Sequence, residues 1–268
     1  MAYFTTTDGT RLFYQDWGQG RPVVLVHCWA AHSGIWDYQL DFLARQGLRC
    51  IAPDRRGHGR SEQSCKGYDF DTLADDLAAL LDHLGLRGAT LVAHSMGAGE
   101  AVRYLSRHGT ARVSRLLLLA PTTPCLRRTA DNPDGFEPEL FEALRAAVRS
   151  DRARWLAENM APFFVAETSP QMMDWVVRMT LDSSLPTWIE TNRINTEADF
   201  RPEMARLELP TLIVHGDRDV SAPLELTGRK SQALIRGSEL RIYEGAPHGL
   251  LLTHKERLNR DLLEFCTA

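Results

Sequence analysis

Several short runs of this chain are apolar at nearly every position, among them "VVLV" at 23–26, "LLLLA" at 116–120 and "TLIV" at 211–214. A strand with one face in water alternates apolar and polar residues, whereas these runs do not. Continuous apolar runs are typical of parallel strands that are covered on both faces. Longer stretches of helical period separate the runs. The sequence therefore predicts an α/β fold, a mostly parallel sheet with helices on both sides.

The predicted elements alternate along most of the chain. The expected strands are Arg11–Trp17, Val23–His27, Arg49–Pro53, Ala89–His94, Arg115–Leu119, Thr211–His215 and Glu239–Tyr243. The expected helices are Ile35–Arg45, Phe70–Leu84, Met96–Arg107, Leu226–Ile235 and Lys255–Phe265.

The alternation stops between residues 121 and 199, where no strand is expected but helical segments carry many Met, Trp and Phe residues. We therefore expect a core domain made of residues 1–120 and 200–268, with residues 121–199 inserted as a helical cap. Large apolar side chains of the cap would form a ceiling over a ligand pocket, because such pockets are mostly apolar. Met160, Phe163 and Trp188 are the candidates for this pocket.

Composition excludes several classes of function. The net charge is −4 and the charges are interspersed, which does not favour binding to nucleic acid or to an anionic membrane. No apolar run reaches membrane-spanning length and the start of the chain does not resemble a signal peptide, so we expect a cytoplasmic protein. The five cysteines are scattered, without a C-x-x-C pair, which favours reduced thiols over disulfides or a zinc site.

Candidate site residues follow the predicted strands, at the sheet edge where α/β proteins bind ligands. Ser95 follows one strand, Asp217 and Asp219 follow another, and His248 lies in a turn after the last. Serine, aspartate and histidine in this chain order are typical of the α/β-hydrolase triad. The spacing alone does not decide which aspartate belongs with the histidine.

Ser95 lies in "LVAHSMGAGEA", where a strand gives way to a helix. This stretch is similar to the G-x-S-x-G nucleophile elbow, with Ala93 in place of the first glycine and Gly97 as the second. A serine hydroxyl is a weak nucleophile until a base takes its proton, and His248 can act as that base. The backbone N–H groups of Met96 and Trp29 are the expected donors to an oxyanion.

Two other classes of function fit the same residues. In an oxygenase or lyase on this fold, His248 and Asp219 would form a base and Ser95 would only position the substrate. A non-catalytic member would use the pocket to bind a ligand. A metal site is not expected, because His27, His94 and His215 lie beside strand ends without ligand pairs or an acidic cluster.

The chain resembles the bacterial arylesterases and cofactor-free haloperoxidases (perhydrolases) of the α/β-hydrolase superfamily. The resemblance runs almost from end to end and is carried by stretches such as "APDRRGHGRSEQ", "NTEADFRPEMARLELPTLIVHGD" and "APHGLLLTHKERLNRDLLEF". It implies a mostly parallel eight-stranded sheet with a helical cap. It also implies a serine hydrolase that cleaves small aryl or alkyl esters or lactones through an acyl-enzyme, without cofactor or metal. Perhydrolysis is implied as a second activity.

The resemblance also bears on individual residues. In similar proteins the acid is the second carboxylate of G-D-x-D-x-x-x-P, which favours Asp219 over Asp217. Cys28 stands where the family usually has glycine, and His94 where the nearest relatives commonly have phenylalanine, so both are expected to affect the pocket. The expected partner is a small-molecule ester or lactone, and the sequence leaves open whether the chain forms a homo-oligomer.

Overall fold

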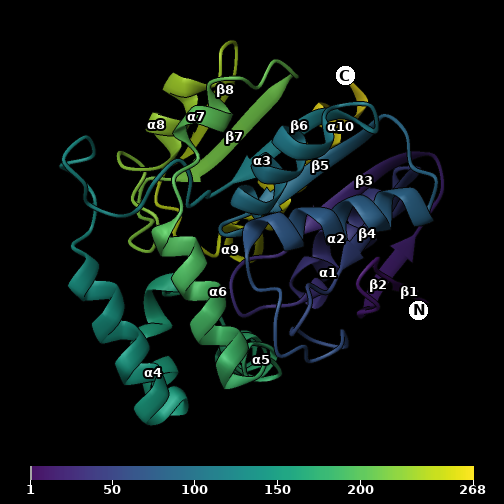
Figure 1. The fold of residues 1–268 in the computed structure, drawn as a ribbon. Helices are drawn as coiled ribbons and strands as arrows, with labels where there is room; N and C mark the ends of the chain where they lie inside the picture. Colours follow the sequence, from purple (N-terminus) through teal and green to yellow (C-terminus); the bar gives the residue numbers. More distant parts are fainter. Residues whose placement is uncertain (1) are drawn as a thin grey trace.

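Eight strands form a single sheet in the computed structural model, which describes residues 2–268 (Figure 1). The strands are β1 (Ala2–Thr5), β2 (Arg11–Trp17), β3 (Arg21–Val26), β4 (Leu48–Pro53), β5 (Ala89–His94), β6 (Val113–Leu119), β7 (Thr211–Gly216) and β8 (Glu239–Tyr243). Their order across the sheet is β1-β2-β4-β3-β5-β6-β7-β8. β2 runs antiparallel to β1 and β4, and all the other neighbours are parallel. The predicted mostly parallel, eight-stranded sheet is confirmed.

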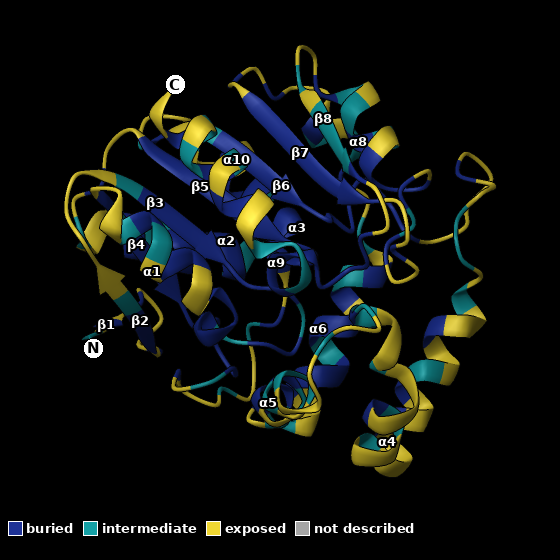
Figure 2. Ribbon diagram, turned by 180° about the vertical axis from the view of Figure 1, so that it is seen from behind, coloured by how far each residue is buried: buried dark blue, intermediate teal, exposed yellow. Residues whose placement is uncertain are grey.

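β5 and β7 are buried along their whole length, and β6 is buried from Leu116 to Leu119 (Figure 2). Successive residues of β3 point to opposite faces of the sheet. Val24 and Val26 pack into one apolar cluster, together with side chains of the helices on that face, whereas Val23 and Leu25 pack into a second cluster on the other face. This double burial is the reason for the continuous apolar runs in the sequence.

Helices cover both faces of the sheet. The helices of residues 2–268 are η1 (Ser33–Trp36), α1 (Asp37–Arg45), α2 (Phe70–His83), α3 (Gly97–His108), α4 (Pro138–Asn159), η2 (Ala161–Phe163), α5 (Pro170–Leu181), α6 (Leu185–Glu197), α7 (Arg201–Met204), α8 (Gly228–Leu234), α9 (Leu250–Thr253) and α10 (Lys255–Thr267). α2 packs with α3 on one face and α1 with α10 on the other. The predicted helices are found at their expected places.

Two elements differ from the expectation. The helix expected from Ile35 begins as the 3₁₀ turn η1 and continues as α1. The edge strand β1 was not predicted: its four residues pair with β2 at one side only, and its burial is partial. A short edge strand lacks the continuous apolar pattern from which the inner strands were identified.

Between β6 and α7 the chain forms α4, η2, α5 and α6, which lie beyond the carboxyl ends of the central strands (Figure 1). α4 bends at Asp151, whose φ of −157° and ψ of 91° are not helical. The division into a core domain and a cap at residues 121–199 stays a prediction. Within residues 2–268, no helix combines the length and the apolar character that crossing a membrane requires.

Candidate active site

Ser95 occupies a tight turn between β5 and α3. Its φ is +58°, a left-handed conformation that non-glycine residues rarely adopt, and its N–H donates to the carbonyl of Leu119 at 2.9 Å. A Cβ at Gly97 would lie 2.9 Å from the Val26 oxygen and 3.0 Å from the His27 oxygen. The glycine is therefore required because the helix starts directly against the neighbouring strand. These are the features of a nucleophile elbow.

A hydrogen-bonded chain joins the three predicted catalytic residues. The Nε2 atom of His248 lies 2.9 Å from Ser95 Oγ, and its Nδ1 atom lies 2.6 Å from Asp219 Oδ2. All three side chains are buried. They come from the loops after β5, β7 and β8, whose carboxyl ends meet at one edge of the sheet. This arrangement lets the histidine take a proton from the serine while the carboxylate holds the other ring nitrogen.

The two aspartates after β7 have different partners. Asp219 accepts hydrogen bonds through Oδ1 from the N–H groups of Ser221 and Ala222, at 2.9 and 2.8 Å, which leaves Oδ2 for the histidine. Asp217 is exposed, and its Oδ1 accepts the N–H of Gly245 at 2.7 Å. The structure thus brings Asp219 to His248 and places Asp217 in a surface turn.

A second histidine, His215, contacts the same carboxylate oxygen of Asp219 as His248 does. Its Nε2 atom lies 3.3 Å from Asp219 Oδ2 and 2.8 Å from the Ala222 carbonyl oxygen. Burial by itself would raise the pKa of Asp219, but attraction to His248 and hydrogen bonds to both histidines hold that pKa well below its usual range. Sequence reasoning considered His215 only as a metal ligand. The i, i+4 spacing with Asp219 was the available signal.

The two predicted oxyanion donors have no protein acceptor. Within residues 2–268, neither the Met96 N–H nor the Trp29 N–H donates to another group of the chain. The Trp29 side chain contacts Trp188 of α6. Its Nε1–H donates to the Trp188 carbonyl oxygen at 3.0 Å, and the centroids of the two side-chain rings are 4.7 Å apart. Helix α6, which carries Trp188, therefore contributes to the position of the loop that carries one of the donors.

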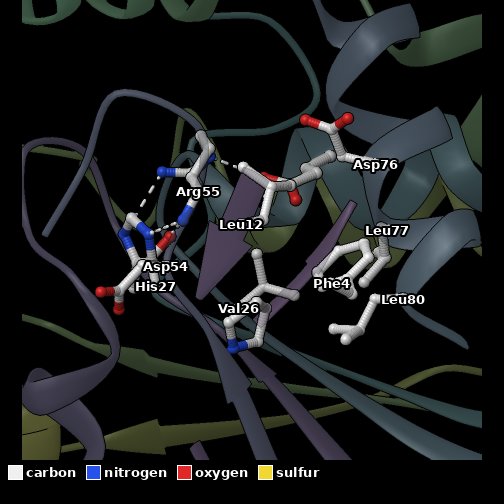
Figure 3. A pocket seen from close by; sticks show the side chains of 11 residues that line it. Phe4, Leu12, Val26, His27, Asp54, Arg55, Asp76, Leu77 and Leu80 are labelled. Atoms are coloured by element: carbon white, nitrogen blue, oxygen red, sulfur yellow. Dashed lines mark hydrogen bonds and ion pairs between the residues drawn. The ribbon is translucent and has the colours of Figure 1, made fainter. Parts of the chain in front are cut away.

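A buried ion pair contacts the loop that carries Trp29. Figure 3 shows its arginine, Arg55, next to the His27 ring. Arg55 Nε donates to Glu100 Oε2 at 2.7 Å, and the same guanidinium donates to the carbonyl oxygens of His27 at 2.8 Å and of Cys28 at 3.4 Å. The Nε2 atom of His27 accepts the backbone N–H of Arg55 at 3.0 Å, and its Nδ1 atom lies 2.8 Å from the Cys28 carbonyl oxygen. The sequence did not predict this ion pair, because nothing in it links Arg55 to Glu100, which lies 45 residues further along the chain.

Cys28 is buried directly before Trp29. Burial raises the pKa of the thiol to about 12, so the side chain stays protonated at neutral pH. A thiol in this state fills space and is a poor nucleophile.

His94 is enclosed immediately before the serine. Its Nε2 atom lies 3.1 Å from the His248 carbonyl oxygen, and its ring is 5.0 Å from the ring of His248 and 6.1 Å from that of Trp36. Burial lowers the pKa of His94 to about 3, and the ring is neutral. Because a neutral ring has one N–H, Nε2 donates to the carbonyl, and Nδ1 has no partner within residues 2–268. His94 therefore anchors the loop that carries His248.

The three cap residues predicted for the pocket lie at different depths. The ring of Phe163 is 5.8 Å from that of His248, and its carbonyl oxygen accepts the Gly249 N–H at 3.0 Å. Met160 is partly buried and packs near both Phe163 and Trp188. Trp188 is fully buried and packs against Trp29. The turn η2 is thus in direct contact with the loop of the histidine.

Among residues 2–268, no three His, Cys, Asp or Glu side chains come together in a way that could hold a metal ion. The histidines near the site are engaged by backbone or by Asp219, as described above.

Comparison with known proteins identifies the family. The α/β-hydrolase fold family matches residues 21–255. The chain is 42% identical to the non-heme chloroperoxidase CPO-A1 of Kitasatospora aureofaciens and 36% identical to the bifunctional esterase/perhydrolase DCH of Acinetobacter calcoaceticus, each over 99% of both chains. It superposes on the esterase of Exiguobacterium antarcticum with a TM-score of 0.97 at 30% identity, covering 100% of this chain and 99% of that one. With this match and a nucleophile-elbow turn after its fifth strand, the chain belongs to the α/β-hydrolase family.

Proposed function

We propose that this protein is a serine hydrolase that cleaves small carboxylic esters or lactones through an acyl-enzyme. The observation that carries the proposal is the hydrogen-bonded chain from Ser95 through His248 to Asp219, with distances of 2.9 and 2.6 Å. The esterase and esterase/perhydrolase named among its relatives support the same reaction class.

Acylation begins when Ser95 Oγ attacks the ester carbonyl carbon and His248 Nε2 takes the hydroxyl proton. The imidazolium that forms is stabilised by Asp219, which remains ionised throughout. When the tetrahedral intermediate collapses, the ester C–O bond breaks and the histidine returns the proton to the leaving alcohol. The products of this half-reaction are the free alcohol and an acyl group on Ser95.

The oxyanion of the tetrahedral intermediate is stabilised by the N–H groups of Trp29 and Met96. Preorganised donors of this kind lower the barrier because they need no reorientation as the charge develops. The buried Arg55 acts on this step indirectly, since it holds the carbonyls on the other side of the Trp29 loop.

In deacylation, water gives up a proton to His248 Nε2 and attacks the acyl carbon. The bond between that carbon and Ser95 Oγ then breaks, His248 returns the proton to Oγ, and the carboxylic acid leaves. Hydrogen peroxide in place of water would give a peracid, which oxidises halide in solution. The names of the chloroperoxidase and perhydrolase relatives support this second activity. Every group in the proposed cycle belongs to the chain, so we propose that neither a metal nor an organic cofactor takes part.

A fluorophosphonate probe and p-nitrophenyl acetate test the proposal together. The wild type should be labelled stoichiometrically at Ser95 and should turn over the ester, whereas a folded Ser95→Ala protein should lose about a thousandfold or more of kcat and all labelling. A Ser95→Ala variant with wild-type kcat would refute the nucleophile assignment. Labelling without turnover of any ester would instead indicate a ligand-binding member of the fold, and catalysis without labelling a lyase or oxygenase.

A further inference from the structure

Helix α4 carries a buried cation on its inner side. Its buried residues are Phe141, Arg145, Val148 and Leu156, of which only the arginine is charged. Arg145 is 9% exposed. Burying a charge is costly, so an enclosed arginine is normally paired with a carboxylate or another anion.

The other buried arginines of this protein follow that rule and Arg145 does not. Arg55 pairs with Glu100 and Arg56 with Asp76, at 2.7 and 2.6 Å. Arg145 donates through Nη1 to two neutral oxygens of α6, Asn192 Oδ1 at 3.2 Å and Thr196 Oγ1 at 3.3 Å. Within residues 2–268 no carboxylate pairs with it, so its charge is left uncompensated by the protein.

Part of the Arg145 guanidinium is also free to bind another group. Its Nε and Nη2 atoms donate to no acceptor in the described chain. Polar atoms of residues 2–268 that are fully buried without a partner do not include Nε or Nη2 of Arg145. Both atoms are therefore accessible to solvent. Guanidinium N–H groups form a planar fork that matches the two oxygens of a carboxylate.

Hydrogen bonds connect this region to the nucleophile. Thr122 N–H donates to the Ser95 carbonyl at 3.4 Å, and Thr122 Oγ1 donates to Asn195 Oδ1 at 2.8 Å. Asn195 belongs to the same turn of α6 as the two partners of Arg145. α4 and α6 pack side by side beyond the carboxyl ends of the strands, where Ser95 lies (Figure 1). Arg145, which bonds from α4 to α6, therefore lies on the side of the molecule where the carboxyl ends of the strands and Ser95 are found.

We propose that Arg145 binds a carboxylate of the substrate, so that the preferred substrates are esters or lactones that carry a second, anionic carboxyl group. This inference rests on the proposed esterase function. It adds a recognition subsite formed by the guanidinium, with Asn192 and Thr196 holding it in place.

The test compares substrates that differ in one charge. The first panel contains ethyl half-esters of succinic, glutaric and adipic acid, each with a neutral partner in which an isopropyl group replaces the carboxylate. A second panel contains acetate esters of short hydroxy acids, which place the carboxylate on the alcohol side. Acid release is followed by pH-stat. We expect wild-type kcat/KM to favour the charged member of at least one pair, and free dicarboxylate to inhibit competitively.

Two variants assign the preference to the guanidinium. Arg145→Gln should lower the charged-to-neutral ratio of kcat/KM roughly 10- to 100-fold, mainly through KM, and Arg145→Lys should retain part of it. Arg149→Gln removes the same charge from an exposed position of α4 and should leave the ratio unchanged. Melting temperatures check that each variant is folded.

The outcomes separate this inference from the proposed function. If neutral esters are hydrolysed but no charged ester is preferred, or if Arg145→Gln and Arg149→Gln change the ratio equally, the carboxylate subsite is refuted and the esterase stands. If no ester of either kind is hydrolysed and Ser95 is not labelled, the proposed function itself is refuted. If Arg145→Gln does not fold, Arg145→Lys decides the question: a lowered charged-to-neutral ratio of kcat/KM supports the subsite, and an unchanged ratio refutes it.

Discussion

The buried pair of Arg55 and Glu100 offers a quantitative test of how the loop of Trp29 is supported. The side chains are 2% and 6% exposed, and Nε and Oε2 are 2.7 Å apart. Glu100→Gln keeps the shape of the side chain and removes its charge, which leaves the arginine buried without a counter-ion. Breaking a buried pair in this way costs about 3–5 kcal/mol.

We expect the loss of unfolding free energy in Glu100→Gln to lie in the lower part of that range. Burial raises the pKa of the Glu100 carboxyl, which means that desolvation already offsets part of its attraction to Arg55. With about 3–4 kcal/mol lost and roughly 2–4 °C per kcal/mol for a chain of this size, the melting temperature should fall by roughly 6 to 16 °C. Activity should fall as well, because Arg55 also holds the His27 and Cys28 carbonyls.

Differential scanning calorimetry at neutral pH, with kcat/KM on p-nitrophenyl acetate measured well below the transition, tests both effects. Glu225→Gln is the matched control, since Glu225 pairs with Arg229 at 2.7 Å on the surface of the protein. An exposed pair contributes about 0–1 kcal/mol, so this variant should melt close to the wild type. If the two variants had the same melting temperature, the reasoning about the buried pair would be refuted.

Three further predictions concern the site. Asp219→Asn should reduce kcat roughly a thousandfold or more, because an amide does not stabilise the imidazolium, whereas Asp217→Asn should chiefly lower the melting temperature; the reverse ranking would move the acid to the other aspartate. Iodoacetamide should alkylate the exposed Cys65 and spare Cys28, with activity retained, as read by peptide mass spectrometry; rapid inactivation that substrate prevents would contradict this. Gly249→Ala would place a Cβ 2.3 Å from the Phe163 carbonyl oxygen and should lower kcat, because it displaces the loop that carries His248. An unchanged kcat would contradict this.

Local patterns predicted most of the fold because both faces of the sheet are buried. The continuous apolar runs identified the inner strands, and helical period identified the helices that cover them. The strand β1 lacks such a run, since only Phe4 of its four residues is buried. Its place at the edge depends on pairing with β2, which no local signal encodes.

The triad candidates could be predicted because the carboxyl ends of parallel strands meet at one edge of the sheet. Ser95, Asp219 and His248 each follow a strand, and the family pattern favoured Asp219 over Asp217. Which aspartate reaches His248 depends on the geometry of the loop. Asp219 contacts the His248 ring, whereas Asp217 accepts the backbone N–H of Gly245.

The sequence by itself determined the fold class, the nucleophile turn and the order of the candidate triad, because these depend on periodicity and on residues adjacent in the chain. Only the tertiary structure brought Glu100 to Arg55 and left Arg145 without a carboxylate. Pairing of buried charges depends on which side chains the fold encloses together. A residue far away in the sequence can supply the opposite charge, as Glu100 does for Arg55. Where the fold supplies none, as at Arg145, we propose that a ligand does.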